Sequence, residues 1–166
     1  MTTSKRIYKS EIDACMQLQN AINRENWSEV VFCGFGEPLE RLDCISEVAR
    51  WIKKYSGKVV RVDTNGQGYL LNNGKDVVKE LKKAGVDRVS VSMNAHNKAT
   101  YNQVCRPTFG NAYEKVLEFI EKTKRENLDM EITAVAIPEV DISKMRKMAK
   151  RMGVAFRSRE YIPCFW

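Results

Sequence analysis

Residues Val30 to Pro38 read VVFCGFGEP, an apolar run followed directly by two glycines, an acid and a proline. The apolar run predicts a short buried strand from Glu29 to Cys33. Glycines at a strand end let the backbone approach a ligand closely, and Glu37 can pair with an ammonium group. Taken alone, such glycines indicate a plain turn more often than a binding site, so their meaning depends on the rest of the chain.

The same strand-and-turn unit recurs along the sequence and alternates with helices. Further strands are expected at 58–63, 88–93, 131–137 and 154–162, and helices at 10–26, 42–57, 77–85, 113–127 and 143–152. This alternation predicts an α/β fold in which helices pack outside a parallel sheet. The chain has 166 residues, whereas an eight-fold barrel needs roughly 250. We therefore expect either an open partial barrel or an open doubly wound sheet.

The first expected helix has no convincing strand before it. We therefore expect a single domain over residues 10–166 that is missing its first strand, with residues 1–9 as an N-terminal extension or truncation point. The strand Val30 to Phe32 would then be an unpaired edge, and unpaired edges promote self-association. A homodimer through this edge is a further expectation.

The composition is that of a soluble globular protein, with 43% hydrophobic and 30% charged residues. No apolar stretch approaches the roughly 20 residues that span a bilayer, and no signal peptide is evident, so we expect a cytoplasmic protein. The net charge of +7 could favour nucleic acid. The lysines, however, lie mostly on expected helix faces and no nucleic-acid motif is present, so solvated outer faces are favoured over a nucleic-acid partner.

Small, polar or charged residues lie at the ends of the five expected strands, at the sheet edge where parallel α/β folds bind ligands. They comprise an acid, amides, hydroxyls and arginines: Glu37, Thr64, Asn65, Ser90, Ser92, Asn94, Arg157 and Arg159. The two serines alternate on one strand and so share one face, which in a barrel is the lumen. The set suits a zwitterionic, hydroxyl-rich ligand. His96, the only histidine, is favoured as a loop or capping group over a proton shuttle.

The ordered series of motifs resembles the radical S-adenosylmethionine (SAM) superfamily. Residues 34–38 resemble its Gly-Gly-Glu motif in a Gly-x-Gly-Glu-Pro form, and the stretches 64–66 and 90–94 follow at family spacing. Residues 94–113 and 159–164 look like the TatD-associated subgroup. The resemblance extends over residues 10–166 and implies a partial (β/α)6 TIM-like barrel.

The resemblance also implies a SAM site and its chemistry. The backbone and side chains of residues 34–37 would bind the methionine amino group, Ser92 and Asn94 would face the ribose and carboxylate, and residue 137 with the pair 161–162 would flank the adenine. The full set of cofactor-binding residues expected from it is Gly34, Phe35, Gly36, Glu37, Thr64, Asn65, Ser92, Asn94, Ile137, Tyr161 and Ile162. The family cleaves SAM reductively to a 5′-deoxyadenosyl radical that abstracts hydrogen from a substrate.

The cysteines depart from the family pattern. The family holds a 4Fe–4S cluster on a Cys-x3-Cys-x2-Cys loop between its first strand and first helix, and such clusters need thiolates. The five cysteines here are far apart, at positions 15, 33, 44, 105 and 164. We therefore expect no metal site, and a fragment of a radical SAM enzyme that is inactive alone, or else a degenerate member. Cys15 and Cys33 are expected to be small buried hydrophobes, whereas Cys164 lies near the ligand rim with its role open.

Two other functions remain alternatives, and the substrate stays open in all of them. A cluster-free α/β-barrel enzyme, such as an aldolase or epimerase, needs a Schiff-base lysine or metal ligands at the strand ends, and the sequence offers neither. The other alternative is a cluster-free protein that binds a small ligand or a protein partner through its open sheet.

Overall fold

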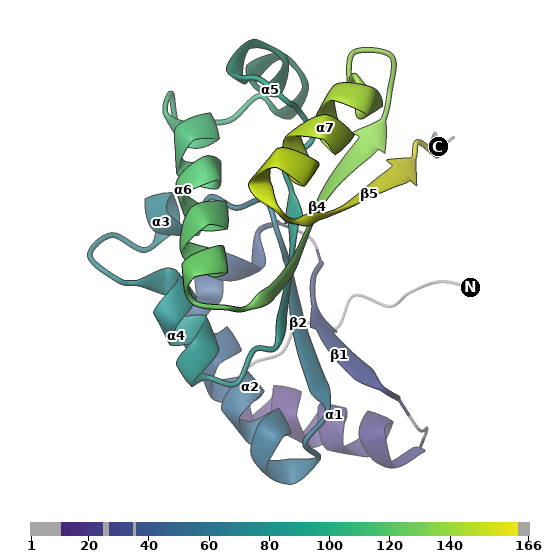
Figure 1. Cartoon of the computed structure of the whole chain (residues 1–166). Helices are drawn as coiled ribbons and strands as arrows, with labels where there is room; N and C mark the ends of the chain where they lie inside the picture. The colour runs from purple at the N-terminus through teal and green to yellow at the C-terminus, as the bar shows by residue number, and fades with distance from the viewer. Residues whose placement is uncertain (1–10, 25–26, 35, 163–166) are drawn as a thin grey trace.

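The fold is a curved, all-parallel sheet of five strands, described by a computed structural model over residues 11–24, 27–34 and 36–162 (Figure 1). Its strands, in chain order and in spatial order, are β1 (Glu29–Phe32), β2 (Val59–Thr64), β3 (Arg88–Ser92), β4 (Asp129–Ala136) and β5 (Ala155–Glu160). Because each strand pairs with the next one along the chain, the sheet winds in one direction only. This order confirms a partial TIM-like barrel and excludes the doubly wound sheet.

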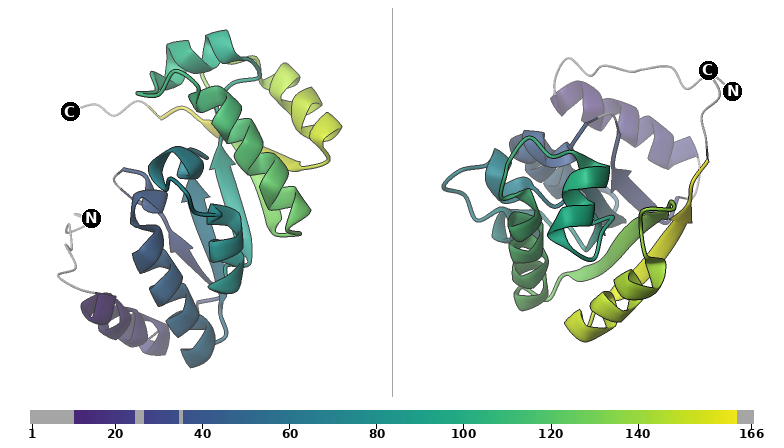
Figure 2. Two further views of the ribbon diagram at one scale, coloured as in Figure 1. Left: turned by 90° about the vertical axis from the view of Figure 1, so that its left-hand side faces the viewer. Right: turned by 90° about the horizontal axis from the view of Figure 1, so that it is seen from above.

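Helices connect successive strands and lie on the convex side of the sheet, as right-handed crossovers require (Figure 2). Five helices lie where the sequence predicts them: α1 (Glu11–Arg24), α2 (Leu42–Tyr55), α4 (Val77–Lys83), α6 (Ala112–Arg125) and α7 (Ile142–Met152). Three further helical segments were not predicted: the 3₁₀ helix η1 (Pro38–Arg41), α3 (Gly68–Leu71) and α5 (Lys98–Cys105). No helix in the described part of the chain is both long and apolar enough to cross a membrane.

The hydrophobic core lies between the convex face of the sheet and the helices. Alternate residues of β2 are buried, and Val60 and Val62 are completely inaccessible to solvent. They belong to the same buried cluster as Ile52 of α2 and Phe119 of α6. The other residues of β2 point to the concave face. This period of two is typical of a sheet with one apolar face and differs from the continuous apolar strands of a fully enclosed parallel sheet.

Side-chain caps fix where several helices begin, and so fix the loops at the strand ends. The Asn97 carboxamide accepts a hydrogen bond from the Thr100 amide (2.9 Å) at the start of α5, and Asp141 accepts one from the Lys144 amide (2.9 Å) at the start of α7. Gly66 follows β2 with a φ of +79°, and a Cβ there would lie 3.1 Å from methyl groups of Val91 and Val116. The tight turn after β2 therefore needs glycine for both conformation and space.

The beginning of the domain was predicted at residue 10, with an extension over 1–9 and no first strand. Residues 1–10 lie outside the described residues. Within the described part, β1 pairs with β2 on one side only.

Candidate functional site

A cavity of about 410 Å³ opens at the carboxyl ends of the strands. Its lining comes from the loops after β2, β3 and β4, from α5, and from the end of β5. The lining residues are Asn65, Gln67, Ser92, Asn94, Tyr101, Val104, Cys105, Val135, Ile137, Val140 and Tyr161. Five of them, at positions 65, 92, 94, 137 and 161, were predicted from the sequence as a cofactor site. Segments far apart in the chain thus meet at the expected edge of the sheet.

Glu37 joins the loop after β1 to the end of β2 beside this cavity. Its Oε1 accepts hydrogen bonds from the Leu39 amide (3.1 Å) and the Thr64 hydroxyl (2.6 Å), and its Oε2 accepts one from the Asn65 amide (2.7 Å). Burial raises the pKa of the Glu37 carboxyl, against the lowering effect of these bonds. Oε2 accepts a single described bond, so it keeps the capacity to accept one more from a ligand.

Thr64 and the glycines complete this end of the site. Thr64 is buried, donates to Glu37 and accepts from the Gly66 amide (3.0 Å). It therefore holds the loop and does not face the cavity. Gly34 and Gly36 have φ values of +145° and +88° and are exposed, with open space where a Cβ would lie. Phe35 lies outside the described residues.

Asn94 ties β3 to β4 at the centre of the site. It adopts a left-handed backbone conformation, with φ +58°, which asparagine tolerates better than most residues. Its Oδ1 accepts a hydrogen bond from the Val135 amide (3.3 Å), and its Nδ2 lies 3.9 Å from the Cys105 thiol. A non-glycine residue in this conformation at a ligand cavity is typical of a site in which the fold holds a side chain in place.

The wall that α5 provides, and Gln67 in the loop after β2, were not predicted from the sequence. The Asn65 carboxamide accepts from the Gln67 amide (2.8 Å), and the Gln67 carboxamide donates to the Tyr101 hydroxyl (3.0 Å). Burial raises the pKa of both Tyr101 and Cys105, so both stay protonated at neutral pH. The Asn-x-x-Thr cap at 97–100 was the one sequence signal for this helix.

The cavity has a polar half and an apolar half. Hydroxyls, amides and a thiol lie towards β2, β3 and α5. The opposite wall is apolar and consists of Val104, Val135, Ile137 and Val140. None of the lining residues is charged at neutral pH. This division suits a ligand with one flat apolar part and one hydroxyl-rich part.

The last strand contributes less than predicted. Tyr161 lines the cavity but is 62% exposed, and Ile162 is 78% exposed and outside the lining. Ile162 and Glu37 therefore border the cavity without lining it. Cys164 lies outside the described residues.

The expectation for Cys33 was wrong. It was predicted to be buried inside a strand, but β1 ends at Phe32 and Cys33 is exposed. The strand is one residue shorter than the apolar run, because the glycine loop begins to turn the chain at that point. The side chain of Cys15 lies outside the part of the chain that is described.

The described residues do not fit an iron–sulfur cluster. Over 11–24, 27–34 and 36–162, with the side chains of 11–15 and Arg24 left aside, no three His, Cys, Asp or Glu side chains are grouped so as to hold a metal. Cys33, Cys44 and Cys105 lie apart, in the loop after β1, on α2 and on α5, and none of these three forms a disulfide. The cavity residues do fit SAM, since their amides, hydroxyls and apolar wall match its hydroxyls and its purine.

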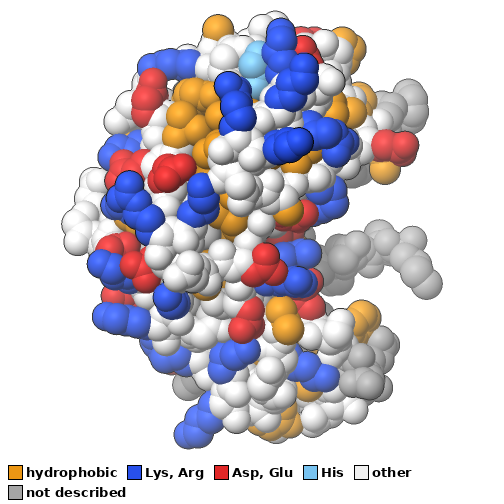
Figure 3. Space-filling model, viewed as in Figure 1, with side chains coloured by type: hydrophobic (Ala, Val, Ile, Leu, Met, Phe, Trp, Pro, Cys, Tyr) orange, Lys and Arg blue, Asp and Glu red, His pale blue; other side chains and the backbone are white. Residues whose placement is uncertain are grey.

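A second hollow, of about 620 Å³, lies on the outer surface beside α7. It is lined by His96 and by the basic side chains Lys144, Lys147, Lys150 and Arg151. Figure 3 shows basic side chains gathered around the single histidine on this face. The His96 Nε2 contacts the Asn97 carboxamide (2.9 Å) in the loop before α5. We place the functional site in the first cavity, because that one lies at the strand ends and contains convergent amides and hydroxyls.

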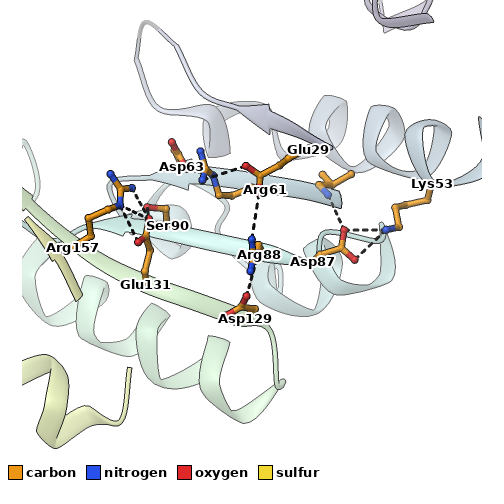
Figure 4. Close-up of polar contacts among 11 residues, drawn as sticks. Glu29, Lys53, Arg61, Asp63, Asp87, Arg88, Ser90, Asp129, Glu131 and Arg157 are labelled. Carbon is orange, nitrogen blue, oxygen red and sulfur yellow. Dashed lines mark hydrogen bonds and ion pairs between the residues drawn. The ribbon is translucent and has the colours of Figure 1, made fainter. Parts of the chain in front are cut away.

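Below the first cavity, a ladder of ion pairs crosses the concave face of the sheet (Figure 4). Arg61 lies between Asp63 (3.0 Å) and Glu29 (3.3 Å), and Arg88 pairs with Asp129 (2.7 Å). These pairs join β1, β2, β3 and β4 at the end of the sheet away from the cavity.

The top of the ladder is Glu131 of β4. It accepts hydrogen bonds from the Ser90 hydroxyl (2.9 Å) and from Arg157 Nε (3.0 Å). The Arg157 guanidinium lowers the pKa of the Glu131 carboxyl. Arg157 was predicted to lie at the ligand rim with Arg159. It belongs to the ladder instead. Residues two apart on a strand share a face but lie at different distances from the strand end, and Arg157 lies further from the carboxyl end of β5 than Arg159 does.

Comparisons with known proteins show the family of the chain. Residues 2–152 match the family model of the radical SAM superfamily. The chain is 30% identical over 133 residues to the GTP 3',8-cyclase of Aliarcobacter butzleri, covering 78% of this chain and 39% of that protein. It is 32% identical over 131 residues to a probable GTP 3',8-cyclase of Methanococcus vannielii, covering 77% and 41%. The chain thus spans about two fifths of the length of these curated relatives.

Solved structures share the fold. Streptococcus suis SuiB bound to S-adenosylmethionine has a TM-score of 0.75 at 16% identity, over 97% of this chain and 36% of that one. TYW1 with a lysine-pyruvate adduct bound has a TM-score of 0.64 at 18% identity, over 90% and 50%.

Proposed function

The chain belongs to the radical SAM superfamily, and we propose that its cavity at the strand ends is the SAM site of such an enzyme. The observation behind this proposal is the convergence of Asn65, Ser92, Asn94, Ile137 and Tyr161 around one neutral cavity. We also propose membership of the TatD-associated subgroup, on the motifs at 94–113 and 159–164.

The two halves of the cavity would hold different parts of SAM. Ile137 and Val140 would pack against the adenine, since flat apolar walls suit aromatic bases. Ser92 and Asn94 would hydrogen-bond the ribose and the carboxylate end. The amide Oδ1 of Asn94 is already bonded to Val135, so its Nδ2 is the group left for a ligand.

Glu37 would act from outside the lining. It fixes Asn65 through the backbone amide, and its Oε2 keeps one acceptor position for the methionine ammonium. The three hydrogen bonds that Glu37 accepts hold this part of the site rigid, which reduces the ordering cost of binding.

SAM supplies the family's radical chemistry only when an iron–sulfur cluster reduces it. These 166 residues contain no Cys-x3-Cys-x2-Cys series. We therefore propose that this chain binds SAM without cleaving it. After anaerobic incubation with iron, sulfide and reductant, no stoichiometric iron should be retained and no 5′-deoxyadenosine should form. Stoichiometric iron with SAM turnover would contradict the proposal.

Titration of the 15N-labelled chain with SAM, followed by amide chemical shifts, tests the site directly. Shifts should concentrate in the loops after β2, β3 and β4. Replacing Asn94 by Ala should weaken SAM binding by roughly tenfold, the effect of losing one good hydrogen bond in a bound complex.

Asn127 offers a matched control for that substitution. It has the same left-handed backbone, with φ +55°, at the exposed end of α6. Asn127→Ala removes an asparagine of the same conformation far from the cavity, so SAM binding should be unchanged. Equal weakening by both variants, or shifts confined to the opposite ends of the strands, would refute the assignment.

A further inference from the structure

Helix α7 carries positive charge that it does not balance within itself. Its sequence, ISKMRKMAKRM, contains five basic residues and no acidic one. The neighbouring helix α6, AYEKVLEFIEKTKR, has four basic residues and three acidic ones. Like charges three or four residues apart repel one another and destabilise a helix. The charge of α7 therefore carries an electrostatic cost that α6 offsets along its own length.

Three of these cations also lack a counter-charge in the fold. Lys147, Lys150 and Arg151 are exposed, and none of them forms an ion pair with a carboxylate among the described residues. Lysines on other helices do find such partners. On α2, for example, Lys53 pairs with Asp87 at 2.9 Å. The outer face of α7 is thus a row of unpaired cations.

An apolar groove between α6 and α7 runs beside this row. It has a volume of about 490 Å³ and is lined by Leu117, Glu121, Lys124, Met148, Arg151 and Met152. Leu117 and the two methionines are only half-buried. Arg151 lines both this groove and the hollow beside α7, so the apolar groove and the row of cations are continuous. Figure 3 shows hydrophobic side chains exposed among basic ones on this face.

We propose that the groove between α6 and α7 docks an acidic amphipathic helix of a partner protein. The apolar side of that helix lies on the leucine and methionines of the groove, and its carboxylates reach the three unpaired cations. Apolar anchors in a groove supply affinity, whereas complementary charges fix orientation and speed the encounter. Methionine side chains are flexible and adapt to the shape of a partner. The groove is on the convex side of the sheet, so this inference does not depend on SAM binding at the strand ends.

Other occupants match the surface less well. Single-stranded nucleic acid binds through bases stacked on aromatic rings, and no Phe, Tyr or Trp is among the described lining residues of the groove or the hollow. A helix that enters a membrane surface buries its apolar face in lipid, but α7 turns Met145 and Ala149 into the core. The residues outside the described ranges contain one acid, Glu25, and so do not supply an acidic helix. A helix of another protein is the occupant that this combination of charge and apolar surface favours.

The probe is a synthetic helix of about 18 residues with a stripe of leucines flanked by glutamates. A peptide of the same composition in scrambled order keeps the charge and loses the stripe. Binding is measured by fluorescence anisotropy of the labelled peptide and mapped by amide shifts of the 15N-labelled chain.

The matched variants reverse two lysines on α7 or two lysines elsewhere. Lys147→Glu combined with Lys150→Glu should weaken the amphipathic peptide by at least tenfold, as expected for two lost charge contacts. Lys54→Glu combined with Lys83→Glu changes the net charge equally at exposed positions of α2 and α4, and should leave binding within about twofold. A peptide with lysines in place of glutamates should bind the α7 variant more tightly than it binds the wild type, which an unfolded variant would not show.

The proposal is supported if the shifts concentrate on α6 and α7 and the α7 variant alone loses the acidic peptide. It is overturned if the peptide does not bind, if the scrambled peptide binds equally well, or if both double variants weaken binding to the same extent. Tighter binding of a single-stranded RNA oligomer, or of phosphatidylcholine vesicles containing phosphatidylserine, through the same two lysines would also overturn it and would assign the surface to that class of partner.

Discussion

Removing the Glu37 carboxylate should destabilise the fold at the edge of the site. Three charge-assisted hydrogen bonds end on it, from the Leu39 and Asn65 amides and the Thr64 hydroxyl. Taken at about 1.5–3 kcal/mol each, they would sum to roughly 4–9 kcal/mol. Two effects reduce this sum: the carboxylate no longer has to be desolvated, and some of the freed donors reach water. We expect Glu37→Ala to lower the free energy of unfolding by about 3 kcal/mol, or Tm by roughly 6–12 °C.

Glu37→Gln should have a smaller, graded effect. The amide oxygen can serve the Asn65 amide, and the NH₂ can donate to the Thr64 hydroxyl, which is free to reverse. The Leu39 amide then loses its partner, at a cost of about 1 kcal/mol. Glu40→Ala, an exposed acid in the same loop, is the matched control and should change stability by less than about 0.5 kcal/mol. Urea denaturation measures all three variants.

The pH dependence gives this prediction a second readout. Burial raises the folded-state pKa of Glu37 above its ordinary value of 4.5. Its contribution to stability is therefore fully present below pH 4.5 and is lost as the pH rises through the folded-state pKa. The difference in unfolding free energy between wild type and Glu37→Gln should widen as the pH falls from neutral towards 4.5. A constant or narrowing difference, or equal losses in Glu37→Gln and Glu37→Ala, would refute the reasoning.

Three further predictions concern the sheet and its helices. Gly85→Ala should lower the free energy of unfolding by about 2 kcal/mol, measured by thermal unfolding, because φ is +88° and the new Cβ would lie 2.5 Å from Lys53 Cγ. Gly153→Ala, where φ is +66° and the space around a Cβ is open, should lower it by only about 1 kcal/mol. Arg157 lowers the folded-state pKa of Glu131, so the contribution of Glu131 to the free energy of unfolding is present above pH 4.5 and is lost as the pH falls through that pKa. Glu131→Gln should therefore make the free energy of unfolding fall less steeply with decreasing pH in the acid range. By light scattering, the wild type should self-associate through the unpaired edge of β1, and Val31→Lys should be monomeric. A wild type that stays monomeric at all concentrations would contradict association through this edge.

The sequence predicted β1 to β4 because each contains β-branched residues, and it predicted β5 (AFRSRE) from its place after the last helix and before a proline. It predicted their common functional edge because parallel strands must end together. It placed the start of β4 two residues late. Asp129 resembles a loop residue in the sequence, but in the sheet it pairs with Arg88 across the strands. Charged residues can occupy strands here because the concave face of the sheet has no helix layer over it.

The missing half of the cavity wall could not be predicted from periodicity. Residues 98–105 contain few apolar side chains, and only Tyr101 of this helix is buried, so no helical stripe appears in the sequence. The helix forms because Asn97 caps it and because Tyr101 packs at an angle against Tyr113 of α6, with ring centroids 5.5 Å apart. Such a helix depends on tertiary contacts, and a single-sequence pattern does not contain them.

The two ends of the concave face differ in a way that only the register reveals. Arg157 and Arg159 are equivalent in the sequence, two arginines separated by a serine. In the sheet, Arg157 is opposite Thr133 and reaches Glu131, whereas Arg159 is opposite Val135 and reaches only Ser92. Arg159 is exposed, so water can satisfy the donors that the Ser92 bond leaves, and the register alone decides which of the two arginines meets a carboxylate. On the lower concave face, by contrast, Arg61, Arg88 and Arg157 each have a carboxylate partner on the sheet.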